Sequence, residues 1–275
     1  NRKHARLKYT IEDRGVDWFR AEVERRANVR FEPARPFAFT GNGDVYGWQR
    51  DDRGRWHYTL FVENGRIRDT GPRQLLGGLR AIAAEHDGLF RLTGNQNLVI
   101  SEVGDAGKGR IDDLLERHGI ANESGASALR RHSMACVGLP TCGLAMAESE
   151  RYLPALIDRL EALVAGRGLR DVPITIRMTG CPNGCARPYI AEIGLVGKGP
   201  GRYNLYLGAG FSGERLNAPY RENIDEAEIV AELEPLIDAF AAGRRADEHF
   251  GDFLVREGFV RRVDTGREFH GSAAA

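Results

Sequence analysis

The chain has 275 residues and a mass of 30.5 kDa, with 42% hydrophobic residues, so it is long enough for two domains with buried cores. Its 39 Lys and Arg residues balance 39 Asp and Glu residues, which excludes the overall positive field typical of nucleic-acid-binding proteins. No apolar run approaches the ~18 residues of a membrane-spanning helix, so neither a nucleic acid nor a membrane is expected as a partner.

The first 45 residues combine charge with one helix signal. Asn1 to Thr10 carries four basic side chains and is typical of a solvated charged loop. From Val16 to Ala27, apolar residues recur on one face and predict an amphipathic helix. Pro33 and Pro36 interrupt regular structure, and the glycines that follow them indicate a loop.

The next stretch alternates between strand and helix patterns. Trp56 to Val62 is rich in aromatic and β-branched residues and predicts a strand, and Asn64-Gly65 is typical of a hairpin turn leading to Arg66–Arg68. This order predicts a small α+β unit of the split βαβ kind. The amide-rich segment Thr93–Asn97 fits either a turn or a loop at a cofactor edge. The remaining expected elements are helices at Leu75–Ile82 and Ile111–His118, and strands at Phe90–Thr93 and Leu98–Ile100.

The last part of the chain begins with a loop of small residues from Ala121 to Arg130. A long helix is expected from Leu144 to Ala165, with Met146 as core filler and a bend at Pro154. Ile174 to Met178 predicts a buried strand. The later expected elements are strands at Ile190–Val196 and Tyr203–Leu207, a tight connector at Lys198–Gly201, a helix capped by Asp225 that runs to Ala242, and a mobile tail at Thr265–Ala275.

All four cysteines lie in two short segments. Cys136 and Cys142 form a C-x5-C pair, and Cys181 and Cys185 form a C-x3-C pair. Disulfides are not needed in a chain that can bury a large core, and structural zinc usually has ligands two to four residues apart. An iron–sulfur cluster accepts wider spacing, so it is the favoured interpretation, with zinc and four buried thiols as alternatives.

The residues beside and between the second pair of cysteines support a tight loop. Gly180 and Gly184 allow the backbone to turn closely around an inorganic core, and Pro182 stiffens the loop. Because thiolate ligands require a reducing compartment, a cytoplasmic location is expected.

Three segments are similar to a known family: Cys136–Cys142, Met178–Cys185 and Ala191–Gly197. Together they resemble the sirohaem and [4Fe-4S] sulfite and nitrite reductases. Further segments resemble the haemoprotein subunits of assimilatory NADPH-dependent sulfite reductases in particular, and the resemblance extends from residue 1 to about residue 263. These segments include Asn1–Lys3, Leu144–Glu148, Pro200–Leu205 and Phe250–Phe253.

The resemblance implies a set of site residues. Cys136, Cys142, Cys181 and Cys185 would hold a [4Fe-4S] cluster. Cys185 would also bridge to the sirohaem iron and so act as the catalytic residue. The residues expected to contact the sirohaem are Asn183, Gly184, Asn95 and Gln96. Gly143 and the segment Ala186–Tyr189 differ from the residues usual at these positions of the family motif, but all four cysteine ligands are present.

The implied activity is the six-electron reduction of sulfite to sulfide in sulfur assimilation. Reduction of nitrite to ammonia is the enzymatic alternative, and a non-catalytic iron–sulfur or zinc module is the other. The electron donor would be a flavoprotein reductase subunit that uses NADPH, or a ferredoxin.

The implied fold class is α+β, a ferredoxin-like half-domain plus a mixed-sheet sirohaem/[4Fe-4S] domain. The expected boundaries are 1–45 for the end of a preceding catalytic domain and a linker, 46–120 for the half-domain, 121–264 for the cofactor domain and 265–275 for a disordered tail. The chain resembles the C-terminal half of the family's protein. Most cations that bind sirohaem and sulfite belong to the N-terminal half, so this chain alone is expected to be inactive.

Overall fold

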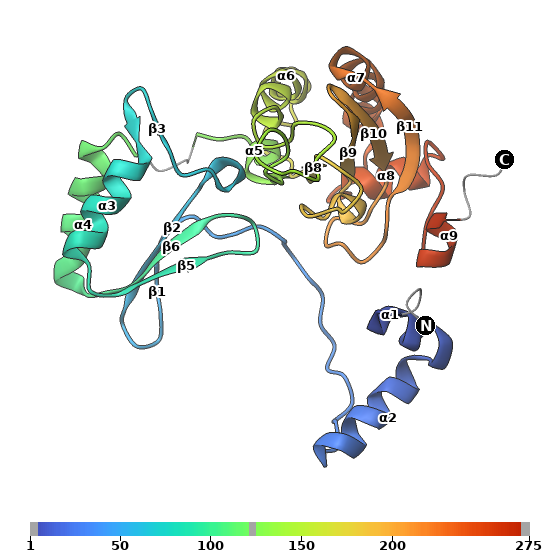
Figure 1. The fold of residues 1–275 in the computed structure, drawn as a ribbon, viewed down its shortest axis with the longest axis horizontal. Helices are drawn as coiled ribbons and strands as arrows, with labels where there is room; N and C mark the ends of the chain where they lie inside the picture. Colours follow the sequence, from blue (N-terminus) through green and yellow to red (C-terminus); the bar gives the residue numbers. More distant parts are fainter. Residues whose placement is uncertain (1–4, 121–124, 271–275) are drawn as a thin grey trace. The chain divides into compact units, whose positions relative to one another are not determined.

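The computed structural model describes residues 5–120 and 125–270. Residues 1–40 and 41–275 form two separate units (Figure 1). The first unit contains α1 (Leu7–Arg14) and α2 (Val16–Ala27), joined at Gly15. The predicted helix α2 is confirmed, whereas the expected loop is wrong from Leu7 onward because Leu7 and Ile11 start a helix one turn apart. Residues 1–4 lie outside the described part of the chain.

The second unit begins with a four-stranded antiparallel sheet in the order β1-β2-β6-β5 (Figure 1). Helices α3 and α4 contact each other and pack their apolar residues against this sheet. Leu60, Ile82 and Ile100 are at most 1% exposed and form the centre of the core. The bounds are β1 (Gly47–Arg50), β2 (Trp56–Leu60), α3 (Leu75–Glu85), β5 (Leu89–Leu92), β6 (Leu98–Val103) and α4 (Asp105–Arg117).

The hairpin predicted at Asn64-Gly65 is wrong, although the turn itself forms. Asn64 adopts the left-handed conformation (φ 50°) within the 3₁₀ turn η2 (Glu63–Gly65). After this turn Arg66 pairs with Glu150, which lies in the region of the second sheet, so the chain leaves the first sheet. The neighbours of β2 are therefore β1 and β6. A short hairpin of β3 (Asp69–Thr70) and β4 (Arg73–Gln74) follows.

The second sheet has five strands in the order β11-β10-β9-β8-β7. Strands β7, β8 and β9 run parallel, whereas β9, β10 and β11 pair antiparallel, which confirms the predicted mixed sheet. Helices α6 and α7 contact each other and share its core. The bounds are β7 (Ser133–Ala135), α6 (Leu153–Gly166), β8 (Ile176–Thr179), η3 (Pro188–Ile190), β9 (Ile193–Gly199), β10 (Arg202–Leu207), β11 (Ala218–Ile224) and α7 (Glu226–Gly243).

The long helix predicted from Leu144 is wrong in its first half. Helix α6 begins at Leu153, and Pro154 lies in its first turn, where a missing N–H costs nothing, rather than bending it. Leu144 is 72% exposed and Met146 42% exposed, so Met146 is not core filler. The backbone of residues 144–152 forms turns because its N–H groups have partners outside any helix, as described below.

Other elements confirm or refine the expectations. Asp225 and Glu228 form a reciprocal capping box at the start of α7, as the sequence predicts. The loop expected up to Arg130 ends in the helical turn α5 (Ala128–Arg131), which Ser127 caps, and residues 121–124 lie outside the described chain. Helix α8 (Phe250–Arg256) comes before the tail expected to be disordered from Thr265. This expectation is wrong for α9 (Gly266–His270), and residues 271–275 lie outside the described chain.

Candidate functional site

The two cysteine segments meet at one edge of the second sheet. Strands β7 and β8 are parallel neighbours, with Ala135 opposite Met178. Cys136 directly follows β7, and its N–H donates to the carbonyl of Met178 at 3.1 Å. Cys181 comes two residues after the end of β8. Because parallel strands carry their carboxyl ends to the same edge, residues distant in sequence start both ligand loops side by side.

A clasp of backbone hydrogen bonds joins the two loops. The carbonyl of Gly180 accepts the N–H groups of Met146 at 2.7 Å and Ala147 at 3.0 Å. The N–H of Glu150 donates to the carbonyl of Cys136 at 3.0 Å. The loop after the first cysteine pair is thus folded across the second. The N–H groups of Ala147 and Glu150 are thus unavailable for the bonds that they would make within a helix beginning at Leu144.

Glycines allow this close approach of backbone to backbone. A Cβ at Gly138 would lie 2.6 Å from the Ser149 nitrogen, and one at Gly180 would lie 2.6 Å from the Ala147 oxygen. On β9, a Cβ at Gly197 would lie 2.4 Å from the carbonyl oxygen of Gly180. No larger residue fits at these positions without displacing the cysteine loops. The roles of Gly138 and Gly197 are not evident from the sequence alone. For Gly197, the available signal is a glycine next to the predicted strand Ile190–Val196.

All four thiols are free, and they differ in exposure. Cys181 is buried, Cys136 and Cys142 are partly buried, and Cys185 is exposed. The N–H of Gly180 donates to the sulfur of Cys136 at 3.2 Å. An N–H donor directed at sulfur stabilises the thiolate, which is the form that binds metals. Cys185 is the thiol best placed to reach a group outside the loops.

The structure contains no single-ion site of the usual composition among residues 5–120 and 125–270. In these residues no three His, Cys, Asp or Glu side chains are grouped closely enough to hold one metal ion. A four-iron core takes one thiolate at each of its four corners.

Two arginines lie close in sequence to the second cysteine pair, Arg177 before it and Arg187 after it. Arg177 on β8 is 8% exposed, and its burial together with the nearby Arg187 cation lowers the pKa of Arg177 to about 10. Its guanidinium reaches the carbonyl of Arg187 at 3.5 Å. Arg187, two residues after Cys185, donates to the carbonyl of Gly94 at 2.7 Å. The second cysteine loop therefore carries positive charge toward the first sheet.

Asn95 and Gln96, expected to contact a cofactor, direct their amides to protein groups. The Gln96 amide nitrogen donates to the Ala135 carbonyl at 2.8 Å, and the Gln96 amide oxygen accepts the N–H of Ala135 at 3.3 Å. The Asn95 amide donates to the Asn42 carbonyl and to the Asp44 carboxylate. In the second cysteine loop, Asn183 is exposed and Gly184 has a positive φ of 69°. Of the four residues expected to contact the sirohaem, only Asn183 and Gly184 thus lie in a cysteine loop.

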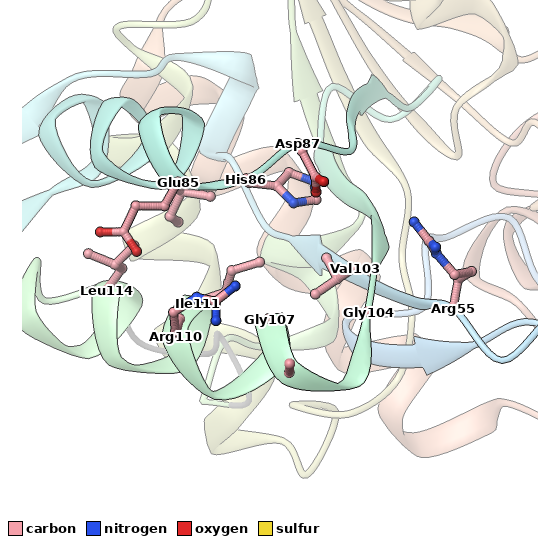
Figure 2. Close-up of a pocket in the computed structure, with 12 residues that line it drawn as sticks. Arg55, Glu85, His86, Asp87, Val103, Gly104, Gly107, Arg110, Ile111 and Leu114 are labelled. Atoms are coloured by element: carbon pink, nitrogen blue, oxygen red, sulfur yellow. The ribbon is translucent and has the colours of Figure 1, made fainter.

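A separate cavity of about 230 Å³ lies in the first sheet's region (Figure 2). Its residues come from β6, α3, α4 and the segments beside them, and none from a cysteine loop. His86, Asp87 and Arg110 contribute polar groups above a floor that includes Ile82 and Ile111. The cavity is therefore distinct from the thiol site.

Among the described residues, no helix is long and apolar enough to cross a membrane.

Comparison with known proteins relates the chain to one group of reductases. The profile of the nitrite/sulfite reductase ferredoxin-like half domain matches residues 49–118. The "Sulfite reductase [NADPH] hemoprotein beta-component" of Shouchella clausii is 56% identical over 98% of this chain and 47% of its own length. The protein of the same name from Chromohalobacter salexigens is 60% identical over 98% of this chain and 47% of its own length. The chain thus spans about half the length of the curated relatives it matches.

Two solved structures have related folds. The Mycobacterium tuberculosis NirA protein has a TM-score of 0.73 and 27% identity, covering 93% of this chain and 48% of its own. Dissimilatory sulfite reductase I has a TM-score of 0.56 and 12% identity, covering 79% of this chain and 74% of its own, and shows the fold alone. These matches agree with the α+β fold and the ferredoxin-like half-domain.

Proposed function

Because the chain is a homologue, over 98% of its length, of the hemoprotein beta-components of NADPH-dependent sulfite reductases, we propose that it is the cluster-carrying part of a sulfite reductase. The complete protein would reduce sulfite to sulfide for sulfur assimilation. The observation that supports this proposal is that the two cysteine segments begin at the ends of two neighbouring parallel strands, on a backbone where only glycine fits.

The donor set and its surroundings fit a [4Fe-4S] cluster. Four thiolates are the usual ligands of such a cluster, and Cys136, Cys142, Cys181 and Cys185 supply them. When bound, the cluster and a sirohaem would supply the electrons and the metal at which the substrate is reduced. Gly180 holds the loops together through its carbonyl and donates its N–H to the sulfur of Cys136. Such N–H to sulfur bonds raise the reduction potential of iron–sulfur centres.

Cys185 has a second role in this proposal. It is the exposed member of the four, so its thiolate faces outward and is available to bridge to the sirohaem iron. Asn183, which is exposed, and Gly184 lie in the same loop and would contact the sirohaem in this proposal. Asn95 and Gln96 use their amides to hold protein groups, and a direct contact of either residue with the sirohaem stays a prediction.

The partners follow from the reaction. A flavoprotein reductase subunit or a ferredoxin would deliver the electrons, and the rest of the full-length protein would supply most cations around sirohaem and sulfite. Cluster thiolates need a reducing compartment, so we place the protein in the cytoplasm. Steady-state rates with sulfite and with nitrite, measured on the full-length protein, test the choice of substrate. A higher kcat/KM for nitrite would overturn the assignment to sulfite.

The two outer cysteines separate the roles of the thiolates. In the full-length protein, Cys185→Ser is expected to abolish the electronic coupling between haem and cluster together with activity, whereas Cys136→Ser mainly lowers the cluster content. Visible absorption and electron paramagnetic resonance spectra measure both effects, with iron content as the control. A Cys185→Ser protein with coupled spectra and normal turnover would contradict the bridging role.

A further inference from the structure

The turn Thr93–Asn97, which joins β5 to β6, is fixed by a dense set of hydrogen bonds. The carboxylate of Asp44 accepts the Thr93 hydroxyl at 2.6 Å and the Asn97 amide at 2.7 Å. Asn97 is 1% exposed, and its amide oxygen accepts the N–H of Val62 at 2.9 Å. Because these bonds are largely shielded from water, the turn is a firm part of the first sheet's region.

This turn contacts the first cysteine segment through Gln96. The Gln96 amide makes two hydrogen bonds to the backbone of Ala135, the residue before Cys136. Strand β7, which ends at Ala135, is the edge strand of the second sheet. The Gln96 side chain therefore occupies the place of a neighbouring strand and fixes the end of β7 from which Cys136 begins.

The same turn contacts the second cysteine segment through Gly94. The carbonyl of Gly94 accepts the guanidinium of Arg187 at 2.7 Å, and this guanidinium also lies 3.6 Å from the sulfur of Met134 in β7. Arg187, two residues after Cys185, has a left-handed backbone (φ 57°). Its side chain extends from the second cysteine loop to Gly94 in the turn. One turn thus holds both the start of the first ligand loop and the end of the second.

The backbone of Gln96 supports a role for its side chain. Gln96 has a φ of 66°, a left-handed conformation that Gly or Asn adopts more easily. For a residue with a long side chain this conformation is unfavourable. The two hydrogen bonds to Ala135 offset that cost. A turn that only reversed the chain would favour glycine here.

We propose that the Thr93–Asn97 turn is a positioning bracket that fixes the separation between Cys136 and Cys185, with Gln96 and Arg187 as its two positioning residues. The proposal rests on the proposed function only in that the group held by the cysteines is an iron–sulfur cluster. Neither residue is a ligand. They act by restricting where the first and last thiolates stand.

The decisive experiment measures this separation without any cofactor. Cys142 and Cys181 are replaced by Ser, spin labels are attached to Cys136 and Cys185, and pulsed dipolar spectroscopy gives the distance distribution in the full chain. Gln96→Leu and Arg187→Ala are each expected to broaden the distribution. Arg187→Lys, which keeps a donor for Gly94, is expected to restore the narrow one. Gln49→Ala changes an exposed glutamine of the first sheet and serves as the matched control.

A further variant separates positioning from stability. Gln96→Gly relieves the left-handed strain while removing the amide, so it should unfold at a temperature no lower than Gln96→Leu, yet broaden the distribution equally. Narrow distributions in both Gln96 variants and in Arg187→Ala would overturn the bracket.

The loaded protein provides an independent measurement. After reconstitution with iron and sulfide, loss of the cluster to a chelator is expected to be about tenfold faster in Gln96→Leu than in the Gln49→Ala control. Equal rates would count against the bracket. Failure of the unmodified chain to bind any cluster would instead contradict the proposed function, and the spin-label distances would still decide the bracket.

Discussion

Gly197 shows how one missing side chain supports the thiol site. It lies on β9, behind Gly180, whose carbonyl accepts two N–H groups from the first cysteine loop. A methyl group at Gly197 would meet that carbonyl oxygen at 2.4 Å and the Cβ of Ala147 at 2.8 Å. The substitution would therefore push apart the backbone segments that form the clasp.

Gly197→Ala is expected to destabilise the chain by about 1–3 kcal/mol, because the crowded neighbour is backbone and cannot rotate away. Native-state reaction of the cysteines with a thiol reagent should become faster. Urea unfolding and thiol kinetics measure the two effects. Gly199→Ala is the matched control, since nothing lies within 4 Å of its Cβ position on the same strand. Equal behaviour of the two variants would show that the glycine contact is not required.

At the scale of elements, Glu192 joins β8, β9 and α8. It is fully buried just before β9, and its carboxylate accepts the N–H of Thr175 at 2.7 Å and the N–H of Gly251 at 2.9 Å. Gly251 lies in the first turn of α8, so the carboxylate binds the positive end of that helix. Burial nevertheless raises the pKa of Glu192 to about 7, with a small contribution from Asp252.

This pKa predicts how stability depends on pH. The unfolded chain releases the Glu192 proton near 4.5, whereas the folded chain retains it up to about 7. The stabilisation is complete below the lower value and is lost as the pH rises through the upper one, by at most about 3 kcal/mol. Glu192→Gln removes this titration, so the stability of the unmodified chain relative to the variant should fall between pH 5 and 7. Unfolding midpoints that run parallel across this range would contradict the prediction.

The elements that the sequence predicted well are those with a complete local signal. Helix α7 has its capping box and buried stripe within or directly beside its own residues, and β8 overlaps the buried strand predicted at Ile174–Met178. The predictions were wrong where hydrogen bonds or ion pairs to residues distant in sequence determine the local backbone conformation. The carbonyl of Gly180 removes residues Met146 and Ala147 from the predicted helix, and Glu150 draws Arg66 away from the predicted hairpin.

In the candidate site, too, the residues with a local sequence signal could be predicted, and those that act through distant partners could not. The four cysteines are evident from spacing and resemblance, since each pair lies within a few residues. The partners of Gln96 and Arg187 are not evident, because Ala135 and Gly94 offer only backbone groups, which leave no mark on residue type. Asn95 and Gln96 stay predictions as cofactor residues, but their amides are already bonded to protein groups.

At the scale of the whole molecule, the first sheet has an exposed edge. All four residues of β5 are exposed, including Leu89 at 49% and Leu92 at 82%. An exposed apolar strand edge usually pairs with another surface. The cations near the cysteine pairs are chiefly Arg177, Arg187 and Lys198, which are few for an anionic cofactor and an anionic substrate.

Residues 1–275 expressed alone are therefore expected not to reduce sulfite, even when their thiols hold a cluster. The test reconstitutes this chain with iron, sulfide and sirohaem and measures sulfide release with a strong chemical reductant. The full-length protein, treated identically, is the positive control. Turnover close to that of the control would show that the remaining half of the protein is dispensable.

The placement of the cysteines on two strands also sets the order in which the site is completed during synthesis. Cys136 and Cys142 precede α6 and β8 in the chain, so the strand that leads to the second cysteine pair is synthesised after the first pair. Gly180 and Gly197, which shape the backbone around the loops, also come later. If the four thiols hold a cluster, as proposed above, their full set exists only once Cys185 has been synthesised, and until then the first pair lacks its partners.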